Sequence, residues 1–136
     1  MIVCATIVRR DKVLLVKHSS EHKPTYGYWI LPAGKVATDE SLEEALKREM
    51  KEELNLRIQI LQKLVEHEDP YTGDRLVGFL CTPLTSKIKI SAELKEAQWF
   101  NRDELQKIEE INPNLKQYLL EILKPGMYSQ FLWRKS

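Results

Sequence analysis

Hydrophobic and polar positions alternate in short blocks near the N-terminus. Residues 2–8 form an apolar run rich in β-branched side chains, and residues 9–12 are polar. A second apolar run at 13–18 is followed by a polar stretch at 19–27. Two apolar runs around a short polar turn predict a β-hairpin, and the polar stretch predicts a loop.

The strongest helical signal lies in residues 41–54. Ser41 and Glu44 have the S-x-x-E spacing of a capping box, and acidic side chains in the first turn suit the positive end of a helix. Asn55 follows the last helical position and tolerates the left-handed conformation that ends many helices. We therefore expect a helix that ends before Asn55.

The rest of the chain mixes apolar runs with two further helical segments, and turns are expected at 32–34 and 70–73. The expected strands are 28–31, 57–67, 75–84, 87–90 and 96–100, and the expected helices are 102–110 and 113–123. This mixture predicts an α/β fold, with a mixed sheet flanked by helices. A chain of 136 residues is expected to form a single domain over residues 1–136.

Three carboxylates crowd into the second half of the expected helix. On a helical wheel centred on Leu42, Glu49 and Glu53 fall about 20° to either side of the inward stripe, and Glu52 falls about 80° away. Inward carboxylates are costly unless they are paired or bind a metal, and Arg48 could neutralise only one of them. Oxygen ligands favour a hard cation such as Mg²⁺ or Mn²⁺. A solvated acidic face and a structural ion-pair network are the alternatives.

A longer pattern contains these acids. From residue 34 the chain reads G-K-V-A-T-D-E-S-L-E-E-A-L-K-R-E-M-K-E-E-L-N-L. This stretch resembles the Nudix box, G-x5-E-x7-R-E-U-x-E-E-x-G-U, in which U is apolar. Asn55 stands where the pattern has Gly, and the matching positions are Gly34, Glu40, Arg48, Glu49, Met50, Glu52, Glu53 and Leu56. The flanking sequences W-I-L-P-A-G and E-L-K-E-A-Q-W-F also resemble those of the family.

The resemblance implies an α/β/α sandwich around a mixed sheet, and hydrolysis of a nucleoside diphosphate linked to another moiety with Mg²⁺ or Mn²⁺. It assigns the metal to Glu49, Glu52 and Glu53, with the carbonyl of Gly34 as a further ligand.

The resemblance also assigns supporting and proton-transfer roles. Glu40 and Arg48 are expected to form an ion pair that orients the loop and the helix. The family varies in its general base, which here could be Glu52, Glu53 or the later Glu93; an ordinary surface acid is the alternative for Glu93.

The substrate is less defined. Lys17 and His18 end the second apolar run and are candidates for phosphate contact, while Trp29 could stack on a base or belong to the core. Pro70 and Tyr71 lie where the family carries markers of ADP-ribose or dinucleoside polyphosphate activity. The candidate substrates are therefore ADP-ribose, dinucleoside polyphosphates and nucleoside triphosphates. A catalytically silent module that senses nucleotides or binds a protein is the alternative function.

Composition limits the partners. Basic and acidic residues number 21 and 20, which argues against a general nucleic-acid binder, and the longest apolar runs are too short to span a membrane. Cys4 and Cys81 stand alone in apolar runs and predict buried reduced thiols in a cytoplasmic protein. The aromatic-rich segment 127–136 is expected to pack on the core, with site closure or a homodimer contact as alternatives.

Overall fold

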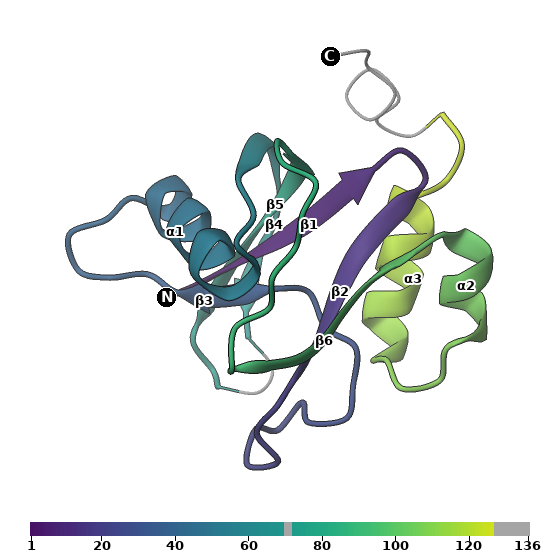
Figure 1. The fold of residues 1–136 in the computed structure, drawn as a ribbon, viewed down its shortest axis with the longest axis horizontal. Coiled ribbons are helices and arrows are strands. Elements are labelled where there is room, and N and C mark those ends of the chain that lie inside the picture. Colours follow the sequence, from purple (N-terminus) through teal and green to yellow (C-terminus); the bar gives the residue numbers. More distant parts are fainter. Residues whose placement is uncertain (70–71, 127–136) are drawn as a thin grey trace.

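The computed structural model describes residues 1–69 and 72–126, and it has helices on both faces of a mixed sheet (Figure 1). Within the described ranges the sheet has six strands in the order β4-β5-β1-β2-β6, with β3 paired to β1. The elements are β1 (Ile2–Arg9), β2 (Lys12–His18), β3 (Ala33–Lys35), α1 (Leu42–Leu54), β4 (Ile58–Glu68), β5 (Arg75–Pro83), β6 (Leu94–Phe100), α2 (Arg102–Lys107) and α3 (Pro113–Ile122). The predicted α/β/α sandwich is confirmed.

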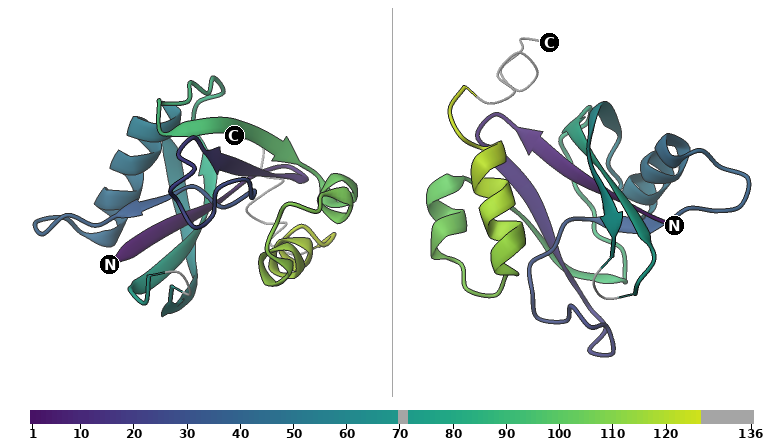
Figure 2. Two further views of the ribbon diagram at one scale, coloured as in Figure 1. Left: turned by 90° about the horizontal axis from the view of Figure 1, so that it is seen from below. Right: turned by 180° about the vertical axis from the view of Figure 1, so that it is seen from behind.

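Strand β1 organises the sheet. It runs parallel to β5 from the Ile2–Leu76 pair to the Ile7–Cys81 pair. Along its other edge it pairs antiparallel first with β3 and then, at its end, with β2. The two halves of the sheet therefore diverge from β1, and β6 pairs antiparallel with β2 in one of these halves (Figure 2).

Two hydrophobic clusters fill the space on either side of the sheet. Alternation along β2 sends Leu14 and Val16 to the α1 side and sends Val13 and Leu15 to the side covered by α2 and α3. Helix α1 closes the first cluster with the fully buried side chains Ala45, Leu46, Met50 and Leu54. This packing fixes the face that α1 turns toward the sheet.

The N-terminal hairpin, the capping box of Ser41 and Glu44 and the left-handed cap at Asn55 are confirmed, the last with φ of 53°. The prediction of a strand at 28–31 is wrong. Trp29 and Ile30 form only isolated bridges, whereas the expected turn at 32–34 overlaps β3. An apolar run does not reveal which sheet edge is free, and the open edge of β1 lies beside residues 33–35.

The prediction of a strand at 87–90 is also wrong. Lys89 N donates to the carbonyl of Leu54, and Ser91 N donates to the carbonyl of Glu53, each at 2.9 Å. This segment therefore satisfies the C-terminal carbonyls of α1 and joins no sheet. Strand β6 begins at Leu94, earlier than expected.

The helix expected at 102–110 ends at Lys107, because Ile108 has an extended backbone. The strands near 57–67 and 75–84 and the helix from Pro113 are confirmed to within a few residues. No helix of the described ranges has the length and apolar character needed to cross a membrane. The aromatic segment 127–136 lies outside the described residues.

Candidate active site

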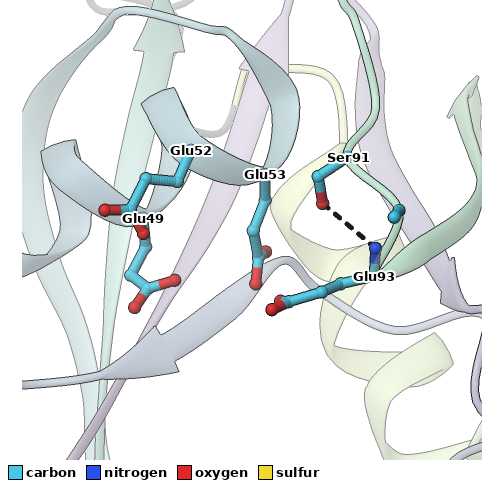
Figure 3. A pocket seen from close by; sticks show the side chains of 6 residues that line it. Glu49, Glu52, Glu53, Ser91 and Glu93 are labelled. Carbon is cyan, nitrogen blue, oxygen red and sulfur yellow. Dashed lines mark hydrogen bonds between the residues drawn. The ribbon is translucent and has the colours of Figure 1, made fainter.

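An acidic pocket of about 380 Å³ lies between the C-terminal half of α1 and the segment that precedes β6 (Figure 3). Its lining residues are Glu49, Glu52, Glu53, Ser91, Ala92 and Glu93. The carboxylates of Glu53 and Glu93 point toward one another across it (Figure 3). The structure thus brings the late glutamate to the three acids of α1.

Backbone hydrogen bonds hold the two walls of this pocket together. The carbonyl of Glu53 accepts the bond from Ser91 N described above, so the segment 91–93 is attached to the end of α1. Ser91 Oγ then accepts a hydrogen bond from Glu93 N at 3.3 Å. The placement of Glu93 therefore follows from the way the chain caps α1.

Glu53 is the most buried of the acids, with 7% of its surface exposed. Among the described residues no group donates a hydrogen bond to its carboxylate, which faces the pocket. Burial raises the pKa of Glu53 to about 8, with contributions from the negative charges of Glu49 and Glu93, while the positive charge of Lys23 opposes the shift. Burial also raises the pKa of Glu49, against the opposing effect of Arg48.

Arg48 connects the pocket to the loop before α1. Its Nη2 and Nε donate to the two carboxylate oxygens of Glu40 at 2.6 and 2.8 Å, and Nη2 also donates to the carbonyl of Lys35 at 3.0 Å. Its Nη1 donates to Glu49 at 3.0 Å and to Glu52 at 3.2 Å. These bonds from Arg48, with one from Ala37 N, lower the pKa of Glu40 to about 2. A planar guanidinium can serve this many acceptors, whereas an ammonium group cannot.

Gly34 lies directly against the side chain of Glu49. It sits opposite Val3 in the β1–β3 pair, and a Cβ at this position would overlap the carboxyl group of Glu49. The glycine is therefore needed for the close approach of the strand backbone to the helix side chain. This contact brings Gly34 next to the acids, as its place in the motif leads one to expect.

The donor set around the pocket suits a hard divalent cation, because it consists of carboxylate oxygens whose charges repel one another. In the described part of the chain, however, no three carboxylate, imidazole or thiol side chains converge closely enough to enclose an ion. The bonds from Arg48 to Glu49 and Glu52 account for this, since they draw both carboxylates toward the guanidinium. The carboxylates of the pocket are therefore chemically suited to bind a divalent cation, and Arg48 would compete with that cation for Glu49 and Glu52.

The structure separates the four residues suggested for substrate contact. The imidazole of His18 contacts the backbone of Glu93 at the edge of the pocket, and burial lowers its pKa, as does Lys23. Trp29 is 6% exposed and packs edge-on against Phe100 in the cluster beneath α2 and α3, so it lies in the core.

Lys17 Nζ lies 4.7 Å from the ring centroid of Trp29 and so is not placed at the pocket. Tyr71 lies outside the described residues. Sequence reasoning gave no weight to Ser91, which has no distinctive spacing. Lys23 likewise carries no distinctive sequence signal, although its charge contributes to the pKa shifts of both Glu53 and His18.

Known proteins resemble this chain in sequence and structure. The model of the NUDIX domain matches residues 1–122. An NAD-capped RNA hydrolase NudC of Haemophilus influenzae is 29% identical over 108 residues, which cover 76% of this chain and 41% of that protein. An ADP-ribose pyrophosphatase of Methanocaldococcus jannaschii is 31% identical over 107 residues, which cover 75% of this chain and 62% of that protein.

Among solved structures, a NUDIX hydrolase from Nitrosomonas europaea has a TM-score of 0.77 and 25% identity, and the match covers 93% of this chain and 71% of that one. The chain spans less than half the length of the NudC relative. The family model, in contrast, covers nearly all of the described residues. The acidic pocket at the end of α1 thus lies within a domain match that covers most of the sequence, and the chain belongs to the Nudix family.

Proposed function

We propose that this protein is a pyrophosphohydrolase that cleaves the diphosphate linkage of a nucleoside diphosphate joined to a second moiety. The observation that carries the proposal is the acidic pocket, which is lined by Glu49, Glu52 and Glu53 of α1 and by Glu93 of the segment before β6. Repelling, partly desolvated carboxylates are unfavourable for stability and are typical of sites that do chemistry.

Glu49, Glu52 and Glu53 would hold a divalent cation, Mg²⁺ or Mn²⁺, with the Gly34 carbonyl beside them. When bound, this cation supplies charge compensation for the phosphate oxygens and lowers the pKa of a coordinated water. Arg48 positions two of these carboxylates through Nη1 and is itself held by Glu40. Glu40 and Arg48 thus orient the ligands and need not touch the substrate.

Two carboxylates are suited to accept a proton from the attacking water. Glu53 is largely buried at the pocket, and Glu93 faces it from the opposite wall, so a water held between them is within reach of either carboxylate. Glu52 is less suited, because its side chain is 58% exposed and bonded to Arg48. We assign the base to Glu53 or Glu93.

The relatives favour two substrate groups that share one linkage. The M. jannaschii relative is named for ADP-ribose and the H. influenzae relative for NAD-capped RNA, and in both substrates a diphosphate joins adenosine to a second ribose-containing group. The near balance of basic and acidic residues favours a small nucleotide over RNA. ADP-ribose, NAD and dinucleoside polyphosphates are therefore the first substrates to test, and nucleoside triphosphates follow.

The test is hydrolysis of this panel and of an NAD-capped RNA, with Mg²⁺ or Mn²⁺ and with EDTA. Wild type is compared with Glu53→Gln, Glu93→Gln and, as a matched control, Glu43→Gln on the exposed first turn of α1. We expect metal-dependent cleavage that falls at least a hundredfold in the first two variants and is unchanged in the control. No cleavage of any substrate by wild type, with nucleotide still bound, would favour the silent sensing module.

A further inference from the structure

The segment that joins β5 to β6 ends in a tight turn, and this turn carries Glu93. The turn begins at Ser91, whose carbonyl accepts a hydrogen bond from Leu94 N at 3.1 Å. Ser91 Oγ also accepts the bond from Glu93 N, so the turn is bonded internally at both of these amides (Figure 3). Ala92 and Glu93 form its exposed tip, and their carbonyls need partners from elsewhere in the chain.

The residue that follows β2 supplies those partners. Ser19 Oγ donates to the carbonyl of Ala92 at 2.7 Å, and Ser19 N donates to the carbonyl of Glu93 at 3.0 Å. The imidazole of the preceding residue, His18, also contacts the backbone of Glu93. The tip of the turn is therefore attached to the end of β2, and one of its bonds comes from a side chain.

A change of register between β2 and β6 brings Ser19 to this position. His18 pairs with Leu94 instead of Lys95, which the register skips. Ser19 therefore meets Glu93, whereas an uninterrupted register would place it opposite Leu94. Irregularities of this kind are common beside active sites, where they redirect a side chain. Here the irregularity places the Ser19 hydroxyl beside the tip of the turn.

The turn is thus held from two sides of the pocket. Ser91 N bonds to the carbonyl of Glu53 and attaches the turn to α1, while Ser19 attaches it to β2. The carboxylate of Glu93 extends from this turn toward that of Glu53 (Figure 3). The separation of the two carboxylates therefore depends on both attachments. A displacement of about 1 Å at a reacting group can lower a rate by up to about a hundredfold.

We propose that Ser19 is a positioning residue, which holds Glu93 opposite Glu53 through the hydrogen bond of its hydroxyl to the carbonyl of Ala92. The inference rests on the proposed function, in which a water between these two carboxylates loses a proton. Ser19 does not line the pocket and lies outside the motif that begins at Gly34, so it acts through Glu93.

The test is steady-state kinetics with the substrate that wild type cleaves fastest. Ser19→Ala is expected to lower kcat about tenfold and to leave KM and the dependence on Mg²⁺ unchanged, because a displaced turn misaligns Glu93 without touching the acids of α1. Ser19→Thr keeps the hydroxyl, and the exposed position has room for a methyl group, so its kcat should stay near that of wild type.

Ser20→Ala is the matched control, because it makes the same change one residue further along. Ser20 Oγ accepts a hydrogen bond from His22 N at 3.3 Å within its own loop. Both alanine variants lose one exposed hydrogen bond and should respond alike to urea. Only Ser19→Ala should lose activity, which separates positioning of Glu93 from a general loss of stability.

A double-mutant cycle shows whether Ser19 acts through Glu93. In the Glu93→Gln background, adding Ser19→Ala should change kcat by less than about twofold, because the group that it positions is already gone. A further tenfold loss in that background, or wild-type kcat in Ser19→Ala alone, would overturn the inference and leave the proposed function intact. Equal losses in Ser19→Thr and Ser19→Ala would overturn the role of the hydroxyl. If wild type cleaves no substrate, the proposed function fails and the inference fails with it.

Discussion

Neutralising Glu53 is expected to stabilise the fold in the absence of divalent cations. The folded-state pKa of about 8 lies above the ordinary value of 4.5, so the folded protein keeps this proton over a range in which the unfolded chain has released it. Stability must therefore fall as the pH rises from about 4.5 to about 8. Glu53→Gln removes the titrating group and should remove this part of the pH dependence.

The size of the effect follows from the shift. Each pKa unit corresponds to about 1.4 kcal/mol. Integrated from the ordinary pKa to neutral pH, the shift amounts to roughly 3 kcal/mol. For a chain of this length that corresponds to an increase in Tm of roughly 10 °C. The variant should thus be more stable than wild type at neutral pH and equally stable below pH 4.5.

Thermal and urea unfolding in EDTA, from pH 4 upward, measures this directly. Glu52→Gln is the matched control. It removes the same charge at the neighbouring position, where the side chain is 58% exposed. Its exposed bond to Arg48 contributes less than about 1 kcal/mol, so its stability should follow wild type. The reasoning fails if Glu53→Gln is destabilised at neutral pH, which would mean that the carboxylate makes favourable contacts in the fold.

Three further substitutions test the surroundings of the pocket. Gly34→Ala should lower activity by more than tenfold and stability by about 1–3 kcal/mol, because its Cβ must displace the Glu49 carboxyl group; kinetics and urea titration measure both. Arg48→Lys should cost about 1–2 kcal/mol and most of the activity, since lysine cannot serve Glu40 and the other acceptors together; wild-type stability would contradict this. Asn55→Gly should raise stability by a few tenths to about 1 kcal/mol with unchanged kcat, because glycine adopts φ of 53° without strain.

Sequence was sufficient for elements whose signals are local. The helix α1 could be placed to within one residue because Ser41, Glu44 and Asn55 mark its ends through short-range hydrogen bonds and backbone conformation. The wheel likewise predicted that Glu53 points inward, which its exposure of 7% confirms. Both inferences depend only on neighbours within a few residues.

The parts that could not be predicted depend on distant partners. Residues 87–90 are apolar enough for a strand, yet Lys89 donates a hydrogen bond to the end of α1, and nothing in the sequence of this segment indicates that helix as the acceptor. The same holds for β3, which requires the free edge of β1. Glu93 could be suggested from resemblance, but its position opposite Glu53 follows from the contact of this segment with α1.

The same helix face explains how the pocket gathers acids that repel one another. Leu46, Met50 and Leu54 are fully buried against the sheet and fix the rotation of α1. Glu49 and Glu53 alternate with them along the helix, so any rotation that released the acids into solvent would also expose core side chains. The hydrophobic energy of the core therefore holds the carboxylates together against their mutual repulsion. A bound divalent cation would recover part of that repulsive energy, so ligand binding should stabilise the fold as well as enable the chemistry.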